Sequence, residues 1–399
     1  MFRKVIFWTH LVTGVVSALV VLTMSFTGVM LTYERQILAW QTKSHYLPSE
    51  EQSTALPLEE LFLIAKTENP ELALSSLVMI NDPGAPVVLR AGRSGSISLN
   101  PYTGEEMSEG SPALDNFFRT MTSFHRWFSI TGENRSIARA ITGACNLMFL
   151  FLILSGIYLW LPKLWKWSIF KTRLFFNHRV NNSKARDFNW HHVFGIWSAI
   201  PLAIIVATAS VFSYGWANNL VYQAFGEAPP VRGPRGAPPS ASNMDVMGSS
   251  FESQKQYLNM DQLFSRANDF ITQQGGDWRQ LSLSLPSETS SVAQFSIDQG
   301  NGGQPHLRHN LSLNRETGTV ASWQPFNSQT PGRQARSIIR FLHTGEALGI
   351  WGQTIAGLVS LISLLMVWTG LALAYRRLIR PLFKKKRRSS ISQSPVPSD

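Results

Sequence analysis

The sequence predicts an α-helical integral membrane protein with four transmembrane helices and two extramembrane α+β segments. Three observations predict this class. Four apolar runs are long enough to cross a bilayer, clusters of Lys and Arg flank them, and the two long segments between runs share one order of helix, strands and turn. The composition agrees, because 44% of the 399 residues are hydrophobic and only 15% are charged.

Each apolar run exceeds the ~20 residues that a helix needs to cross ~30 Å of hydrocarbon. We expect transmembrane helices over residues 1–35, 137–161, 189–217 and 343–376. The apolar core of the first run is about twice as long as that of a signal peptide, and no A-x-A cleavage site follows it. We therefore interpret the first run as a retained anchor.

The basic residues predict the orientation of the chain. The 162–188 loop has seven Lys or Arg against one acid, and the segment from Arg376 to Arg388 has eight against none. Because cytoplasmic loops carry an excess of Lys and Arg, we expect the N-terminus, this loop and the 377–399 tail to be cytoplasmic. The net charge of +11 thus reflects membrane flanks and does not indicate nucleic-acid binding.

The chain has one cysteine, Cys145, within an apolar run. A single cysteine forms no intrachain disulfide and provides no cysteine cluster for zinc or iron–sulfur. It also excludes the C-x-x-C-H motif that attaches a c-type haem covalently.

The two outer segments, residues 36–136 and 218–342, resemble each other. Each contains an N-x-x-T-G turn, at 100–104 in the first and 314–318 in the second, and Gly supplies the positive φ that such a turn requires. The expected helices are 56–68 and 260–273, and the expected strands are 77–80, 87–90, 280–285 and 293–297. We therefore predict that each segment is a copy of one small α+β domain. Residues 226–248 and 389–399 are expected to be flexible because of their composition.

Five of the nine histidines lie at the ends of the expected transmembrane helices. His10 and the adjacent His191 and His192 belong to the cytoplasmic side, whereas His125 and His343 belong to the outer side. A helix rises ~1.5 Å per residue, so His10 lies ~36 Å from the other end of its helix. On each side of the membrane the histidines therefore come from two different helices. Two haem sites, each with two axial imidazoles, would require this arrangement.

Glycine spacing favours a flat cofactor beside these histidines. Gly14 follows His10 by four residues, and Gly195 follows His191 by four. Residues four apart share a helix face, so each glycine leaves room for a macrocycle lying against the helix. The residue four after His192 is isoleucine, which makes His191 the preferred ligand and His192 the alternative.

Two neutral imidazoles in an apolar surround indicate non-covalent b-type haem, because zinc needs three or four converging ligands. We expect two b-type haems, with Arg126 near a propionate of the outer one. The other basic residues near the histidines are Arg3, Lys4, Arg139 and Arg340. Plainer explanations stay open at each position: an interfacial histidine, a glycine for helix packing and a cation that anchors the interface.

Several motifs occur in a characteristic order. They are Trp8-x-His10-x-x-x-Gly14, Phe124-His125-Arg126-Trp127, Ser155-Gly156-Ile157-Tyr158-Leu159-Trp160, Trp190-His191-His192, Leu342-His343-Thr344-Gly345 and Thr369-Gly370. As a set they resemble the PepSY-associated transmembrane family, and within it the FoxB-type ferric-siderophore reductases. The resemblance extends to about Arg380. Family members commonly have His-Arg at the start of the first helix, whereas His10 is followed by Leu11, so a propionate contact at that position is in doubt.

The resemblance implies a di-haem protein of the bacterial inner membrane with periplasmic PepSY-like domains at 36–136 and 218–342. Such a protein takes electrons from an unidentified donor and reduces a ferric siderophore in the periplasm, which releases Fe(II). The substrate rests on the resemblance alone. Two alternatives stay open: a non-enzymatic PepSY sensor or binding protein, and a transporter of siderophore or haem. Against a transporter, Pro201 is the only proline well inside an expected span.

Overall fold

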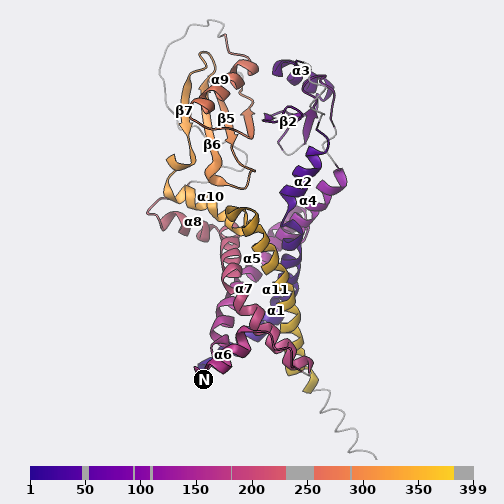
Figure 1. Ribbon diagram of the computed structural model, residues 1–399, viewed down its shortest axis with the longest axis vertical. Helices are drawn as coiled ribbons and strands as arrows, with labels where there is room; N and C mark the ends of the chain where they lie inside the picture. The colour runs from indigo at the N-terminus through magenta and orange to yellow at the C-terminus, as the bar shows by residue number, and fades with distance from the viewer. Residues whose placement is uncertain are drawn as a thin grey trace, which may run out of the picture. The chain divides into compact units, whose positions relative to one another are not determined.

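The computed structural model describes residues 1–46, 54–92, 95–107, 111–180, 182–230, 256–287 and 290–381. Among them are four helices long and apolar enough to cross a membrane, as the sequence predicts (Figure 1). These spans are α1 (Phe2–Leu31), α5 (Arg135–Trp160), α7 (Ser183–Ser213) and α11 (Gly349–Leu378). The segments expected to be flexible, 226–248 and 389–399, lie mostly or entirely outside the described residues.

The four spans form a bundle in which each packs against two others, in the order α1, α5, α7, α11 and back to α1. Consequently α1 and α7 are diagonal, and so are α5 and α11. Large apolar side chains point outward, such as Leu19 and Ile200, which are 73% and 74% exposed. Such a surface is stable in hydrocarbon, where a helix also satisfies its own backbone hydrogen bonds. We call the end where α1 begins the N-terminal end of the bundle, and the opposite end the far end.

Two span boundaries differ from those expected. Helix α7 begins at Ser183 because the Asn182 side chain accepts a hydrogen bond from the Ala185 amide and caps the helix. The expected 343–376 helix is interrupted, because Gly345 adopts φ +79° and ends a separate helix before α11 starts. His343 therefore lies on this preceding helix, α10. Shorter helices outside the spans are α2 (Glu34–Lys43), α4 (Pro112–Trp127), α6 (Trp167–Leu174), α8 (Gly215–Gln223) and α10 (Pro331–Thr344).

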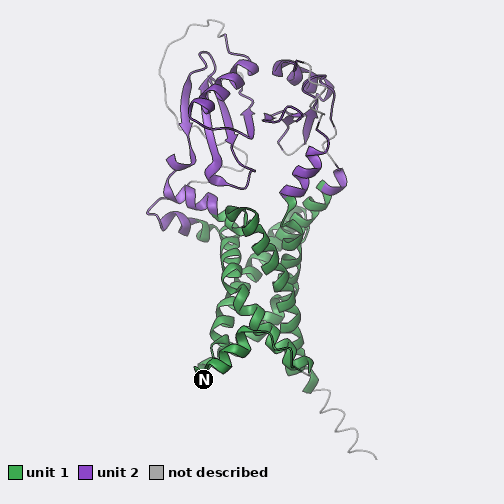
Figure 2. Cartoon of the chain, in the orientation of Figure 1, with its two compact units in different colours: residues 1–34, 115–218, 339–399 green, residues 35–114, 219–338 purple. Residues whose placement is uncertain are grey.

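The two long segments between spans fold into one compact unit, residues 35–114 and 219–338 (Figure 2, purple). Its strands are β1 (Ser76–Ile80), β2 (Val87–Arg90), β3 (Ser96–Leu99), β4 (Gln280–Ser284), β5 (Val292–Asp298), β6 (Arg308–Asn314) and β7 (Val320–Gln324). They form one antiparallel sheet in the order β3-β2-β1-β4-β5-β6-β7. The two segments meet where β1 pairs with β4, with Val78 opposite Ser282. The two copies are thus joined edge to edge.

A helix from each copy contributes to the shared core of this unit. The helices are α3 (Leu58–Glu68) and α9 (Met260–Gln273), and each caps the other. The Asp261 carboxylate accepts from the Leu58 amide at 3.0 Å, and Glu59 Oε1 accepts from the Met260 amide at 3.1 Å. A carboxylate at a helix N-terminus satisfies free amides and complements the helix dipole. This exchange links the two copies of the repeat.

The N-x-x-T-G turns have the same hydrogen bonds in both copies. Asn100 Oδ1 accepts from two turn amides, and Asn314 Oδ1 accepts from the two equivalent amides. Gly104 and Gly318 close the turns with φ of +73° and +69°. The sequence prediction of left-handed glycine at these turns is confirmed.

We expect Gly104→Ala to lower the free energy of unfolding by about 2 kcal/mol, since a side chain is disfavoured at this φ and its Cβ would lie 2.6 Å from Ile64 Cδ1. Gly92 has φ +59° with nothing within 4 Å of an added Cβ, so Gly92→Ala should cost only the conformational part, about 1 kcal/mol. Urea titration of the solubilised full chain, followed by near-UV circular dichroism, measures both. Equal effects would show that the contact with Ile64 does not matter.

Candidate functional site

His125 and His343 form a pair at the far end of the bundle. His125 lies near the end of α4 and His343 near the end of α10. Their ring centroids are 6.2 Å apart, with an angle of 60° between the ring planes. Two imidazoles on opposite sides of one metal have centroids about 6 Å apart, since the metal–nitrogen bond is about 2 Å and the nitrogen lies about 1 Å from the ring centre. The spacing of this pair therefore suits two axial ligands of one metal.

His10 and His191 lie at the N-terminal end of the bundle. His10 is on α1 and His191 is on α7, which are diagonal spans. Each lies within the first three turns of its helix, and the two helices begin at the same end of the bundle (Figure 1). The sorting of the four histidines into two pairs at opposite ends, which the topology predicts, is therefore the arrangement in the structure. Their role as ligands stays a prediction.

The hydrogen bond of the His10 ring determines its tautomer. Ser155 Oγ lies 2.8 Å from His10 Nδ1 and 2.6 Å from the Phe151 carbonyl oxygen. A hydroxyl has a single hydrogen, and Ser155 donates it to that carbonyl, which can only accept. His10 Nδ1 must therefore carry the proton and donate to Ser155. The lone pair of the neutral ring then lies on Nε2, which is available to a metal.

The same reasoning applies to the other three histidines. His191 Nδ1 lies 3.0 Å from Thr369 Oγ1, and His125 Nδ1 lies 2.9 Å from Thr27 Oγ1. Both threonine hydroxyls donate to a carbonyl of their own helix, so they accept from the ring. His343 Nδ1 lies 2.9 Å from the Ile205 carbonyl oxygen, which only accepts. All four rings thus present a deprotonated Nε2, and such partners at Nδ1 are typical of metal-ligating histidines.

The hydroxyl partners repeat between the two halves of the bundle. Thr27 follows His10 by seventeen residues, and Thr208, which lies 3.4 Å from His343 Nδ1, follows His191 by seventeen. Ser155 near the end of α5 corresponds to Thr369 near the end of α11. The duplication seen in the sheet therefore extends to the histidine sites.

Three of the partners are followed directly by glycine, as Thr27-Gly28, Ser155-Gly156 and Thr369-Gly370. A Cβ added at Gly156 would lie 3.5 Å from Cε1 of His10, and one added at Gly370 would lie 3.4 Å from Cε1 of His191. A Cβ added at Gly28 would lie 3.7 Å from Cε1 of His125. The hydroxyl thus bonds to the ring, and the glycine that follows it lies against the same ring at van der Waals distance.

The glycines chosen from sequence spacing face other residues. A Cβ at Gly14 would meet Leu152 at 3.7 Å, and one at Gly195 would meet Met366 at 3.3 Å. Both contacts are helix packing between adjacent spans. Sequence reasoning therefore missed the glycines and hydroxyls beside the rings, because those come from neighbouring helices. The available signal was the hydroxyl–glycine dipeptide.

His192 has a different environment from His191. Its Nδ1 lies 2.9 Å from the Phe188 carbonyl oxygen of its own helix, and its ring lies 4.1 Å from the Phe188 ring. The His191 ring is instead bonded to Thr369 on another span. This contrast favours His191 as the member of the pair with His10.

Arg126 belongs to a group of arginines beside the far-end pair. Its guanidinium lies 5.0 Å from the centre of the Trp127 ring, and that of Arg135 lies 3.9 Å from the same ring. Burial, and then the nearby Arg139, Arg135 and Arg340, lower the pKa of Arg126. Positive charge is therefore concentrated next to His125, where an anionic group would be stabilised.

The described part of the chain contains no group of three or more His, Cys, Asp and Glu side chains placed to hold a metal ion. At each end of the bundle two imidazoles from different helices are paired, whereas a zinc site uses three or four converging protein ligands. The donor set fits the two axial positions of a haem.

The sequence model of the family described as the PepSY-associated TM region matches residues 7–377. The chain belongs to the PepSY-associated transmembrane family. The match includes all four histidines and nearly all of the four spans. None of the curated proteins compared with the sequence matches it. Membership of this family and the four apolar helices together identify a multi-pass membrane protein.

Proposed function

We propose that this PepSY-associated protein binds two b-type haems and passes electrons across the bacterial inner membrane to a ferric siderophore. His10 and His191 would hold one haem, and His125 and His343 the other. Each Fe(III) ion in a siderophore complex would accept one electron in the periplasm and leave the chelate as Fe(II). A one-electron reductant on the cytoplasmic side would supply that electron.

The observation that carries the proposal is the shared state of the four histidines. Every ring donates from Nδ1 and leaves Nε2 free, and one pair has the centroid spacing of axial ligands. Histidines that served only at the membrane interface would not need an oxygen partner at Nδ1 of every ring, nor partners that correspond between the two halves of the bundle. The fixed tautomer also removes the need for the rings to reorganise when a metal binds.

Haem supplies an iron that cycles between its ferric and ferrous states. The protein would supply the imidazoles that hold the haem and the hydroxyls that orient those imidazoles. Arg126 and its neighbouring arginines would pair with propionates at the far end. His10 and Thr27 are seventeen residues apart on α1, and His191 and Thr208 are seventeen apart on α7. Seventeen residues correspond to about 25 Å along a helix. The two sites would thus be separated by much of the bilayer.

The orientation belongs to the proposal. The basic 162–188 loop and the basic C-terminal residues place the N-terminal end of the bundle in the cytoplasm by the positive-inside rule. The unit that contains the sheet would then be periplasmic. It would contact the siderophore, whose identity rests on the resemblance to ferric-siderophore reductases.

Liposomes that contain the protein and enclose dithionite test the function. A ferric hydroxamate siderophore and a ferrous-specific chelator are added outside. We expect the ferrous chelate to form outside only in liposomes that contain the protein. Uptake of the siderophore without a change in iron redox state would instead favour a transporter. Absence of both would favour a non-enzymatic binding protein.

The hydroxyl of Thr369 should affect haem retention without being a ligand. We expect Thr369→Val to weaken binding of the haem at the N-terminal end by about 10- to 100-fold, because the His191 ring loses its acceptor. Thr369→Ser keeps a hydroxyl and should retain near-normal binding. Haem transfer to apomyoglobin, followed by absorbance, measures the loss. Equal retention by both variants would show that the Thr369 hydroxyl does not hold the ring.

A further inference from the structure

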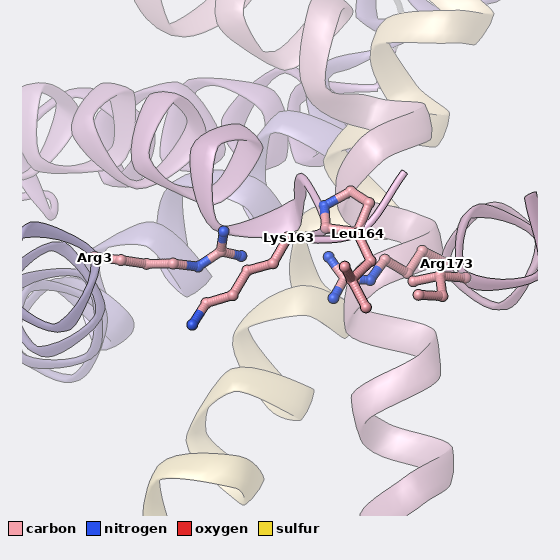
Figure 3. Close-up of a pocket in the computed structure, with 6 residues that line it drawn as sticks. Arg3, Lys163, Leu164 and Arg173 are labelled. Atoms are coloured by element: carbon pink, nitrogen blue, oxygen red, sulfur yellow. The ribbon is translucent and has the colours of Figure 1, made fainter. Parts of the chain in front are cut away.

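A basic pocket lies at the N-terminal end of the bundle, beyond the last turn of α5. It has a volume of about 330 Å³. Its lining residues are Arg3, Pro162, Lys163, Leu164, Ile169 and Arg173. Arg3 and Arg173 enter from opposite sides, with Lys163 and Leu164 between them (Figure 3). The lining thus contains three cations and no carboxylate.

The two arginines also cap the C-terminus of α5. Arg3 Nη2 donates to the carbonyls of Leu159 and Leu161 at 2.7 and 2.8 Å, and Arg173 donates to the Trp160 carbonyl. Free carbonyls at a helix end attract cations in this way. The partial negative charge of the helix end offsets only part of two full positive charges. Burial, and then the charge of Arg3, lower the pKa of Arg173, so an anion in the pocket would relieve repulsion.

Lys163 is not used for capping. Among the described residues, its side chain has no hydrogen-bond or ion-pair partner, and Lys163 lines the pocket with the two arginines (Figure 3). The exposed Lys163 adds a third positive charge to a lining that contains no carboxylate. Its position is explained if the pocket receives an anion from outside the chain.

The surroundings of the pocket indicate the kind of anion. Leu164, Trp165 and Trp167 follow α5 directly and are 62%, 76% and 69% exposed. Large exposed apolar and Trp side chains beside a span are typical of the membrane interface. A soluble phosphate would not need this apolar rim, whereas a lipid would place its acyl chains along it. Basic pockets at the ends of transmembrane helices bind anionic lipid head groups.

We propose that this pocket binds the phosphate of an anionic phospholipid, with Lys163 as the cation that discriminates it from a zwitterionic lipid. Arg3 and Arg173 would share the phosphate with the carbonyls that they cap. The lipid would thereby hold α1, α5 and α6 together at the end of the bundle that carries His10. The proposal does not depend on the function of the histidines.

Native mass spectrometry of the full-length protein tests the proposal, with phosphatidylglycerol and phosphatidylcholine as competing probes. We expect the wild-type chain to retain phosphatidylglycerol in preference to phosphatidylcholine. Lys163→Gln should reduce that preference by about fivefold, the effect of one basic residue near an anionic surface. Lys171→Gln makes the same charge change on α6 outside the pocket lining and should leave the preference unchanged. Lys163→Glu should reduce it further than Lys163→Gln.

Two results would overturn the proposal. One is an equal effect of Lys163→Gln and Lys171→Gln, which would indicate general surface charge. The other is full displacement of phosphatidylglycerol by millimolar inorganic phosphate, which would indicate a site for free phosphate. Lys163 makes no hydrogen bond within the described chain, so its replacement should leave folding intact. An unchanged thermal unfolding midpoint of Lys163→Gln confirms that the comparison is valid.

Discussion

Replacing His125 or His343 with alanine should remove about one of two haems from each chain and abolish the reduction of ferric siderophore. In the proposal each ring would be one of two haem ligands at the far end of the bundle, and the two rings lie only 6.2 Å apart, centroid to centroid. Loss of either ring leaves the iron with one protein ligand, which does not hold a low-spin haem. Pyridine haemochrome analysis counts the haem, and the liposome assay measures the reduction.

The pair should behave as a unit, so the double variant should lose no more haem than either single variant. His45→Ala is a suitable control, because His45 bonds within its own segment and lies outside the bundle. If both single variants keep two haems and full activity, the assignment of the far-end site is wrong.

Replacing His191 with alanine should also remove about one haem, and it should block the entry of electrons from the cytoplasmic side. The adjacent His192 gives a matched test, since His192→Ala changes the same residue type at the next position. His191 donates to Thr369 on another span, whereas His192 bonds to a carbonyl of its own helix. We therefore expect His192→Ala to keep two haems and most of the activity.

The two variants should also differ in electron transfer from inside the liposome to the far-end haem, which only His191→Ala should lose. With His191→Ala, dithionite added outside should still reduce the haem at the far end, while dithionite enclosed in liposomes should not. A loss of haem in His192→Ala and retention in His191→Ala would reverse the assignment. His10→Ala should match His191→Ala, because the two rings would share one iron.

The sequence predicted the features that depend on local patterns. Apolar length identified the four spans, and helix 260–273 matches α9 at both ends, since Asn259 and Gln262 form a capping box there. The strand at 87–90 matches β2, and the glycines of both N-x-x-T-G turns have positive φ. Each of these follows from residues close together in the chain.

Features that depend on contacts between distant residues were not predicted. The pairing of β1 with β4 joins the two outer segments into one sheet, and no residue within either strand specifies that edge. The helix boundary at Gly345 was missed because the expected span was extended back from the apolar run, which begins at Ala347, to include His343.

At the candidate site, too, the sequence predicted what depends on a single helix and not what depends on contacts between helices. The order of the spans along the chain grouped the histidines as they are found at the two ends of the bundle, but the i+4 rule considered only a single helix. The glycines that lie against the rings are Gly28, Gly156 and Gly370, each on a different helix from the histidine that it contacts. Only the packing of four helices reveals that each follows the hydroxyl that holds a ring.

The central claim is that four imidazoles hold two haems, and an optical spectrum of the purified protein tests it most directly. A reduced-minus-oxidised spectrum combined with a pyridine haemochrome count should show low-spin b-type haem at about two per chain. Each of His10, His125, His191 and His343 bonds through Nδ1 to a hydroxyl or carbonyl oxygen, which leaves Nε2 to a metal in the proposal. A protein isolated from haem-replete cells with no low-spin haem would contradict the claim.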